Sequence, residues 1–509
     1  MSSKKYGLVF EDKEEDCVLQ VENSIGFLTE DTSKAYLPDE GRGNNVLIEG
    51  ENYTALRCLR YSHTNKIDVI YIDPPYNTGN KDFVYNDEFI DEEDSFRHSK
   101  WLSFMKRRLS IAKELLSDRG VIFISIDDNE LFQLKMLCDQ IFGEKNFIAN
   151  LIWKNKFNGG YDAQFMTIEH EYILCYAKNI GTAHVNYVPF NVDDDRAYRF
   201  TDEYVSIRGK YKVMNLDDKS LKYSDSLNFA IIAPDGEAIH PENCWRWGKD
   251  KVSWGIDNGF LSFVKDKGKW RVNKKQYQYC DNDGAILVRA YPLRSIIDGV
   301  SNTNSSNEIK DLFGDKTVFQ YAKPVELIKK LLFVASQKDS IILDFFAGSG
   351  TTGQAVAELN NEDGGTRQFI LITNNDVSDK LPMGICSQVT HPRLVKTIGK
   401  ENLRYFRVSL EAEDSKHDSD HVWQLVAGNK LVDTLKLKYG TFYFVEETKE
   451  FSIFTNNDNS FYLSIWHKNI VPHKMSHQKK LNEICENNVI HVCRYDSYPR
   501  EYLRVFNEK

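Results

Sequence analysis

Two short motifs, in an uncommon order, most constrain the fold of this chain. Asp73-Pro74-Pro75-Tyr76 directly follows the apolar run 67–72. Phe346-Ala347-Gly348-Ser349-Gly350-Thr351-Thr352 follows the apolar run 340–344, far downstream. Apolar, β-branched runs of this length predict buried strands of a parallel sheet, and ligands bind at the carboxyl ends of such strands. The pair therefore predicts one α/β domain whose ligand site has two halves, supplied by distant parts of the chain.

Strands and helices alternate on both sides of a long irregular stretch, as in βαβ units. Gly120 is expected to end the helix that begins near Leu102, and Asp127 to Glu130 to form a capping box for the next helix. The polar run Ser301 to Asn307 is expected to be a loop. The expected strands are 46–48, 67–72, 121–126, 340–344 and 368–373, and the expected helices are 102–116, 131–141, 324–335 and 351–359.

The length of 509 residues exceeds what one simple core usually organises, so two or three domains are expected. The aromatic stretch 440–463 reads as short strands. The expected organisation is an N-terminal extension at 1–45, the first part of an α/β domain at 46–184, an insert at 185–310, the second part at 311–405 and a C-terminal α+β extension at 406–509.

Composition excludes several classes of protein. The net charge of −10 argues against a protein that coats nucleic acid passively, but it permits a local basic cleft. Nine cysteines occur singly with no Cys-x-x-Cys pair, so neither a zinc ribbon nor a disulfide framework is expected. No apolar segment reads as a signal peptide or a membrane span, and a reducing cytoplasm is the expected compartment.

The glycine loop at 344–352 has the features of a ligand loop at a helix start. Gly348 and Gly350 permit positive φ and close backbone approach, and the free N–H groups of the helix that begins at Thr351 favour an anionic group. The alternative is a tight strand-to-helix turn without a ligand. Lys323, before the helix that Pro324 starts, could also hold a carboxylate, or it is a surface lysine.

The residue types of the tetrapeptide suit the methylation of an exocyclic amine. Such an amine is a poor nucleophile because its lone pair is delocalised into the ring. Asp73 can accept one N–H and a backbone carbonyl the other, while proline stiffens the turn and Tyr76 offers a flat face to a base that has left the duplex. The alternative is an ordinary surface turn.

With these motifs the chain resembles the β-class DNA amino-methyltransferases, in which the catalytic tetrapeptide precedes the donor loop. It is most similar to the modification subunits of type III restriction–modification systems. The similarity covers about 46–180 and 310–405 and includes the stretches 47–52, 71–79, 98–102, 120–130, 141–144, 170–172, 319–328, 342–352, 369–375 and 391–393.

The resemblance implies a Rossmann-like methyltransferase fold with permuted motif order and S-adenosyl-L-methionine as cofactor. It implies that Asp73, Pro74, Pro75 and Tyr76 hold the target base, and it places the cofactor among Glu51, Lys323, Pro324, Asp344, Phe345, Phe346, Ala347, Gly348, Gly350, Thr351, Asn374 and Asn375. Asp rather than Ser at position 73 favours adenine N6 over cytosine N4. Neither metal-ligand spacing nor a catalytic role for His98 or His170 is expected.

The insert has the strongest basic patch of the chain. Residues 245–276 hold nine Lys or Arg against three Asp, together with six Trp or Phe. Cations position phosphates and flat side chains contact bases, so the segment fits the target-recognition domain that the resemblance implies; the alternative is a small domain with an aromatic core and a solvated basic face. The candidate DNA contacts are Trp245, Arg246, Trp247, Lys249, Lys251, Lys269, Arg271, Lys274 and Lys275.

Double-stranded DNA is the expected partner, a homodimer is the expected assembly, and an ATP-dependent restriction subunit would supply any cleavage, because no helicase or nuclease motif occurs here. Two alternatives stay open. The chain is mainly a DNA-specificity and assembly subunit that recruits such a nuclease, or it is a solitary methyltransferase.

Overall fold

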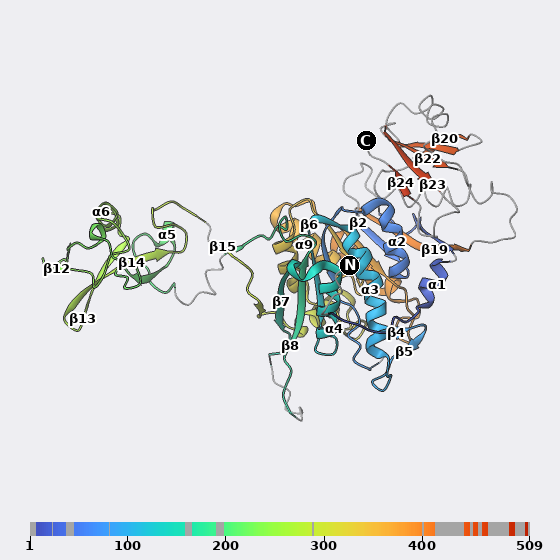
Figure 1. Cartoon of the computed structure of the whole chain (residues 1–509), viewed down its shortest axis with the longest axis horizontal. Helices are drawn as coiled ribbons and strands as arrows, with labels where there is room; N and C mark the ends of the chain where they lie inside the picture. Colours follow the sequence, from blue (N-terminus) through green and yellow to red (C-terminus); the bar gives the residue numbers. More distant parts are fainter. Residues whose placement is uncertain are drawn as a thin grey trace. The chain divides into compact units, whose positions relative to one another are not determined.

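The computed structural model describes residues 7–22, 24–36, 45–80, 82–157, 165–189, 198–287, 290–399 and 402–412, and the strands 442–447, 451–456, 461–466, 488–493 and 504–506. The chain forms two compact units, drawn in Figure 1. The first comprises Met1–Asn186 and Arg294–Lys509, and the second is Tyr187–Leu293. None of the described helices combines the length and the apolar character needed to cross a membrane.

The first unit contains a ten-stranded sheet in the order β1-β19-β2-β18-β17-β3-β6-β8-β7-β16. From β19 to β6 the neighbouring strands are parallel, and β8 is antiparallel to both of its neighbours. The parallel α/β sheet expected from the sequence is therefore present. Its strands are β1 (Ser24–Glu30), β2 (Asn45–Glu49), β3 (Ile67–Ile72), β6 (Leu116–Ile126), β7 (Phe147–Lys154), β8 (His170–Ala177), β16 (Ile296–Ile297), β17 (Ile341–Asp344), β18 (Gln368–Thr373) and β19 (Leu403–Ala412).

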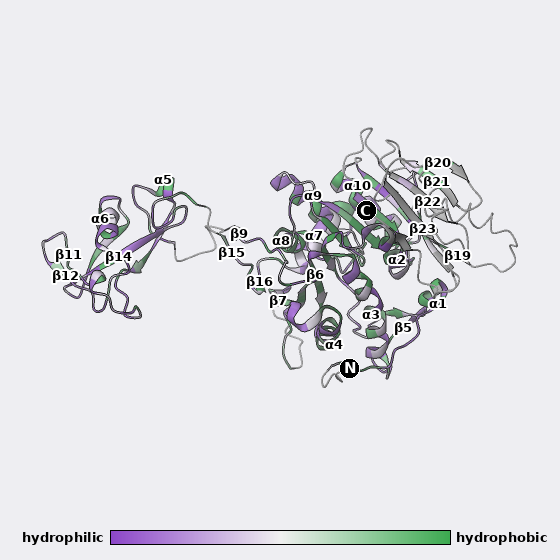
Figure 2. Ribbon diagram, turned by 45° about the horizontal axis from the view of Figure 1, so that its top comes forward, coloured by the Kyte–Doolittle hydropathy of each residue, from purple (hydrophilic) through white to green (hydrophobic). Residues whose placement is uncertain are grey.

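Helices cover this sheet in two groups. Consecutive residues of β3 are buried, so both faces of the strand need cover, and Figure 2 shows the central strands mostly in the green of apolar residues. Helix α3 packs against both α2 and α4, and α9 packs against both α8 and α10. The helices of this unit are α1 (Asp16–Glu22), α2 (Asn52–His63), α3 (Arg97–Leu115), α4 (Leu131–Cys138), α7 (Asn302–Phe313), α8 (Val325–Ala335), α9 (Thr351–Asp363) and α10 (His391–Ile398), with short turns η1 (Asp139–Gly143), η2 (Glu144–Asn146) and η4 (Cys386–Thr390) and a hairpin of β4 (Val84–Tyr85) and β5 (Glu88–Phe89).

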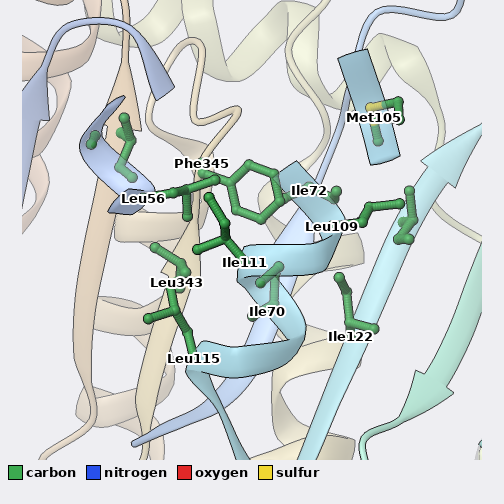
Figure 3. Close-up of a cluster of buried hydrophobic side chains, with 14 of the residues drawn as sticks. Leu56, Ile70, Ile72, Met105, Leu109, Ile111, Leu115, Ile122, Leu343 and Phe345 are labelled. Atoms are coloured by element: carbon green, nitrogen blue, oxygen red, sulfur yellow. The ribbon is translucent and has the colours of Figure 1, made fainter. Parts of the chain in front are cut away.

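The main core lies directly beneath the two motifs. Figure 3 shows Leu56 of α2, Ile70 of β3 and Leu109 of α3 in one cluster with Leu343 and Phe345, all of them buried. Burial of each such side chain contributes about 1.5–3 kcal/mol. Because Leu343 and Phe345 belong to the strand and loop of the second motif, this core holds the glycine loop against β3.

Gly120 does not end a helix, contrary to expectation. Helix α3 ends at Leu115, and the chain enters β6 at Leu116, whose backbone is extended. A Cβ at Gly120 would lie 2.9 Å from the carbonyl oxygen of Ile67, so glycine is required there for the close approach of β6 to β3.

The capping box expected at 127–130 is also absent. Glu130 is the N-cap residue of α4 but makes no side-chain cap, and α4 ends at Cys138, so Ile141 lies in the following π-helical turn. The Asp127 carboxylate instead accepts a hydrogen bond from the N–H of Asn129. The carboxylate of Glu130 is buried and accepts a hydrogen bond from the side chain of Asn77.

The run expected to be a loop at 301–307 is the start of helix α7. Ser301 and Asn304 form a capping box, and Ile309 is fully buried. The polar composition misled the interpretation because serine and asparagine favour both loops and helix N-termini.

The compact units differ from the expected boundaries. The second unit ends at Leu293, so β16 and α7 belong to the sheet-bearing unit, where β16 pairs with β7. The edges of the sheet also extend into the expected flanking regions. Strand β1 pairs with β19 along its length, and β19 pairs with β2.

The second unit has a separate aromatic core. Trp245, Phe260 and Tyr277 are almost fully buried and pack with Trp247 and Val272. Its elements are α5 (Val205–Arg208), β10 (Tyr211–Asn215), η3 (Asp225–Leu227), β11 (Ile231–Ile232), β12 (Ala238–Ile239), α6 (Lys249–Asp257), β13 (Leu261–Asp266) and β14 (Lys269–Tyr277), with the short strands β9 (Val188–Pro189) and β15 (Ala290–Tyr291).

The C-terminal region contains a five-stranded sheet in the order β20-β21-β22-β23-β24. The strands expected at 440–463 are found there. The bounds are β20 (Phe442–Glu447), β21 (Phe451–Asn456), β22 (Phe461–Trp466), β23 (Asn488–Cys493) and β24 (Arg504–Phe506).

The aromatic core predicts a local loss of stability. In Trp245→Ala, removal of a buried indole should destabilise the second unit by about 3–5 kcal/mol. Hydrogen exchange of peptides from 187–293 should accelerate, while exchange in β3 and β6 stays unchanged. Lys269→Ala, which removes an exposed side chain from the same unit, is the control and should exchange like the original protein. Equal exchange in the two variants would contradict the assignment of Trp245 to a core.

Candidate functional site

Four neighbouring parallel strands end at one edge of the sheet, in the order β2, β18, β17, β3. Asp73 follows β3, Asp344 ends β17, Asn374 follows β18 and Glu51 lies just beyond β2. Carboxyl ends of parallel strands share an edge. The structure therefore brings the predicted residues of both halves to one edge, although they come from distant parts of the chain.

The tetrapeptide is held rigidly from two sides. The Tyr76 hydroxyl donates to Oδ1 of Asp73 at 2.9 Å, and the indole Nε1 of Trp101, from α3, donates to the carbonyl of Pro75 at 2.7 Å. Trp101 is fully buried. The turn that presents Asp73 is thus anchored in the core and does not depend on a ligand for its shape.

Glu130 anchors the residue after the tetrapeptide. Asn77 has a left-handed backbone with φ of 58°, and its Nδ2 donates to Oε1 of Glu130 at 2.5 Å. Nδ1 of His98 lies 2.7 Å from the same oxygen. Burial lowers the pKa of His98 and raises the pKa of Glu130 to about 8, so at neutral pH the pair is a neutral hydrogen bond. His98 thus contacts the same carboxylate that holds Asn77.

Lys323 lies at the half of the site that the tetrapeptide forms, which is called the acceptor half below. Its Nζ is 2.9 Å from Oδ1 of Asp73 and 3.3 Å from Oε2 of Glu171, and it lies 4.9 Å from the ring centroid of Tyr76. The sequence placed Lys323 with the cofactor. In this structure its ammonium instead joins two carboxylates, of which Glu171 was not among the predicted site residues.

The protonation of Asp73 reflects opposing effects. Burial raises its pKa, and the neighbouring charge of Glu171 raises it further. The Lys323 ammonium and the hydrogen bonds from Lys323 and Tyr76 act in the opposite direction. The same two carboxylates raise the pKa of Lys323, so this lysine stays charged.

Asp344 is the buried acid at the half of the site that the glycine loop forms, which is called the donor half below. Its Oδ2 accepts from the Thr352 hydroxyl at 2.6 Å and its Oδ1 from the N–H of Phe346 at 3.0 Å. These bonds tie the end of β17 to the start of α9. Burial, with a smaller contribution from the charge of Asp73, raises the pKa of Asp344 to about 7.

The glycine loop has the conformation that the sequence indicated. Gly348 and Gly350 have φ of 48° and 83°. A Cβ would come within 3.3 Å of the Phe319 ring at Gly348 and within 3.1 Å of Thr390 at Gly350. Positive φ and close neighbours therefore favour glycine at both positions, and Gly348 is the partly exposed residue of the two.

A buried arginine, Arg393, donates hydrogen bonds to two hydroxyls of this loop. Nη1 of Arg393, which is fully buried, donates to the hydroxyls of Ser349 and Thr351 at 3.0 and 2.9 Å. Its Nη2 lies 3.6 Å from Glu308, whose carboxylate accepts from the N–H of Val325 at the start of α8. Arg393 thus links the N-terminal ends of α8 and α9.

Glu51 joins an ion-pair network at the start of α2. Its Oε2 accepts from the N–H of Thr54, and its Oε1 pairs with Nη2 of Arg108 at 2.7 Å. Arg108 also pairs with Glu15 at 2.6 Å and donates to the side chain of Asn52, which in turn donates to the carbonyl of Phe345. Although Glu15, Cys17 and Glu51 lie close enough to hold a metal, a guanidinium already neutralises both carboxylates.

The two asparagines after β18 differ. Asn374 is exposed and contacts Asp376. Asn375 is used within its own loop, because its amide bonds the carbonyl of Met383 and the N–H of Ser387. Of the two, Asn374 is the better placed to contact a ligand.

The predicted DNA contacts of the second unit fall into three groups. Trp245 and Trp247 are core residues, and Nε1 of Trp245 donates to the carbonyl of Phe229. Lys251 pairs with Asp283 and Lys275 with Asp202, and Lys274 is partly buried with its pKa lowered by burial and by Arg246. The exposed cations are Arg246, Lys249, Lys269 and Arg271, of which Arg246 pairs with Asp218 and Arg271 with Asp266.

The interpretation of the sequence missed four residues that shape the site: Trp101, Arg108, Glu171 and Arg393. Glu171 and Arg393 lie in stretches that resemble the family. No local sequence pattern, however, predicts which side chain a single charged residue will pair with. Their roles depend on side chains far away in the chain.

Comparison with known proteins agrees with this geometry. A family model described as DNA methylase matches residues 67–385. The Mod subunit of the type III restriction-modification enzyme StyLTI from Salmonella typhimurium is 34% identical over 74% of this chain and 61% of its own length. The type II methyltransferase M.KpnI from Klebsiella pneumoniae is 33% identical over 68% of this chain and 84% of its own length.

Among solved structures, PvuII DNA methyltransferase (cytosine-N4-specific) aligns with 71% of this chain and 95% of its own, at 10% identity and a TM-score of 0.35. The chain belongs to the DNA methylase family, since the family model covers most of it. It spans less than two thirds of the length of the StyLTI relative.

The raised pKa of Asp344 predicts a pH-dependent stability difference. The unfolded chain loses this proton near pH 4 and the folded chain near pH 7, so the carboxylate destabilises the fold increasingly as the pH rises across that window. Three pKa units correspond to about 4 kcal/mol. Asp344→Asn removes this effect, so its melting temperature relative to the original protein should rise between pH 5 and pH 8.

The control is Asp118→Asn, which changes an exposed carboxylate on β6 and should show a constant difference. A difference for Asp344→Asn that does not change with pH would show that Asp344 titrates normally.

Proposed function

We propose that this protein transfers a methyl group from S-adenosyl-L-methionine to N6 of an adenine that is flipped out of duplex DNA. One observation carries the proposal: Asp73 and the glycine loop follow β3 and β17, which are paired parallel strands with Leu343 opposite Ile70. The pairing supports the proposal, because methyl transfer needs the two bound molecules side by side and Asp73 and the glycine loop follow neighbouring strands.

The donor half fits this cofactor. Bound there, S-adenosyl-L-methionine supplies a methyl group that its sulfonium already activates. Gly348 is partly exposed just before the N-terminus of α9, where N–H groups and the helix dipole attract the carboxylate of an amino acid. Glu51 and Asn374, at the ends of the flanking strands, are the side chains that we assign to the cofactor's polar groups.

The acceptor half can prepare the amine for attack. We assign one N–H of the amine to the carboxylate of Asp73 and the other to the carbonyl of Pro74, because the carbonyl of Pro75 already accepts from Trp101. Two acceptors draw the nitrogen towards tetrahedral geometry and localise its lone pair. The ring of Tyr76 offers stacking that offsets part of the cost of extruding the base.

The choice of adenine rests on residue 73. An aspartate at the first position of the tetrapeptide favours N6 of adenine, and N4 of cytosine is the alternative. Methylation of unmodified DNA followed by nucleoside analysis separates the two products.

We assign the reading of DNA to the second unit. Lys269 and Arg271 are exposed and two residues apart in β14, so they project from the same face of the strand. Trp245 and Trp247 are buried in the core of this unit, so we assign them a structural role and not a DNA contact. The cations therefore position phosphates, while the residues that read bases stay unassigned.

We also propose that the chain acts with an ATP-dependent restriction subunit and forms a homodimer. The relatives support the proposed restriction partner, since three Mod subunits of type III restriction-modification enzymes are 30–35% identical to this chain. Co-purification of a large second subunit would support this role, whereas full activity alone would favour a solitary methyltransferase. A monomeric mass in solution with full activity on duplex DNA would refute the dimer.

The first test of the function is Asp73→Ala. Loss of the acceptor should lower methylation of unmodified genomic DNA about 100-fold or more. Binding of S-adenosyl-L-methionine, measured by calorimetry, should stay near the original value because the glycine loop is untouched. Asp118→Ala is the matched control and should methylate normally. Normal methylation by Asp73→Ala would refute the site.

The second test is the double variant Lys269→Ala/Arg271→Ala. If both cations contact phosphates, the slope of log K for DNA binding against log salt should become shallower by about 1.8. Lys145→Ala, an exposed lysine of the first unit, should leave the slope unchanged. An unchanged slope in the double variant would remove this face from the DNA interface.

A further inference from the structure

The carboxylate of Asp73 is engaged on one side only. Nζ of Lys323 and the hydroxyl of Tyr76 both contact Oδ1, each at 2.9 Å. Within the part of the chain that the structure describes, Oδ2 receives no hydrogen bond, and the Asp73 side chain remains 23% exposed. One oxygen is therefore anchored, and the other faces the accessible side of the site.

Glu171 connects the two groups that anchor Asp73. Its Oε2 accepts from the hydroxyl of Tyr76 at 3.1 Å and pairs with Lys323 at 3.3 Å. Its own position is held by Asn155, whose Nδ2 donates to Oε1 at 2.7 Å. Lys323 is only 10% exposed, so its ammonium depends on these carboxylates rather than on water.

We propose that Lys323 and Glu171 are positioning residues for the methyl transfer: the Lys323 ammonium, held by Glu171, keeps Asp73 ionised and fixes it through Oδ1, so that Oδ2 receives the amine of the target base. This inference rests on the proposed function and adds to it two residues that act through Asp73. An ionised acceptor is needed because a protonated carboxyl can turn its O–H towards the amine and cannot hold it equally well.

The charge arrangement explains why both partners are needed. Burial and the charge of Glu171 oppose the ionisation of Asp73, and Lys323 is the cation that contacts it. Without Lys323, Asp73 would be a buried carboxylate next to a second one, a situation that favours the protonated form. The titratable groups that face this cluster are Tyr71 on β3, Tyr76 after β3, Asp127 after β6, Glu171 on β8, Lys323 before α8 and Asp344 on β17.

The charge arrangement predicts a specific pH signature. In Lys323→Met, Asp73 should ionise only at higher pH, so the acid limb of the single-turnover methylation rate should move up by about one unit or more. At a pH well below both pKa values the rate should fall about tenfold for each unit of displacement, in proportion to the ionised fraction. The measurement uses saturating S-adenosyl-L-methionine, unmodified genomic DNA and a pH range that brackets neutrality.

A second substitution should restore part of the lost rate. In Lys323→Met/Glu171→Gln the opposing charge of Glu171 is also gone, so Asp73 ionises more readily. The acid limb should therefore move back by about half a unit, which raises the rate on that limb roughly threefold over the single variant. A purely structural role for Lys323 predicts the reverse, because two altered residues would damage the site more than one.

Lys329→Met is the matched control, because it makes the same change one turn into α8, where the ammonium pairs with Glu358 and Glu362 instead. Its pH profile should match that of the original protein. An unchanged acid limb in Lys323→Met, or no recovery in the double variant, would overturn the proposal.

If Lys323→Met fails to bind S-adenosyl-L-methionine, the pH profile of Lys323→Arg tests the proposal instead. It keeps the cation, so its acid limb should stay in place even at a reduced rate, and an upward displacement would overturn the proposal. Absence of methylation by the original protein would instead refute the proposed function.

Discussion

The pairing of β17 with β3 is the interaction on which the rest of the site depends. These strands come from two blocks of sequence that the second unit separates, yet they are neighbours in the middle of the sheet. Their shared core includes Ile70, Leu343 and Phe345, whose burial makes the register costly to shift. A change in that pairing would move the glycine loop away from Asp73, because each motif is only the continuation of its strand.

The site also needs careful placement of charge. Asp73, Glu171 and Asp344 are carboxyl groups gathered at one sheet edge, and burial raises the pKa of Asp73 and of Asp344. The protein treats them differently. Lys323 lies against Asp73 and Glu171, whereas Asp344 is held by a hydroxyl and a backbone N–H without a cation. Lys323 thereby favours the charged form of Asp73, whereas Asp344 has no such cation and burial raises its pKa to about 7.

Local patterns predicted the parallel core well and failed where two structures share one composition. Runs such as 67–72 and 368–373 have apolar character that only a buried strand satisfies, and both were confirmed. The polar run after Ser301 suits a loop or a helix N-terminus equally, and only the burial of Ile309 selects the helix. Gly120 resembled a helix end because glycine has several uses, and its actual use is a close approach to Ile67 that no local pattern encodes.

By itself, the sequence determined the class of fold, the order of the two motifs and the residue types of each, because these depend on residues that are adjacent in the chain. Asp73 follows its strand and Gly348 precedes its helix whatever surrounds them. Tertiary structure alone decided which charges meet: Lys323 lies against Asp73 and Glu171, and Arg393 lies beneath the glycine loop. Such contacts join side chains from separate elements, and their geometry exists only after the sheet has aligned its strand ends.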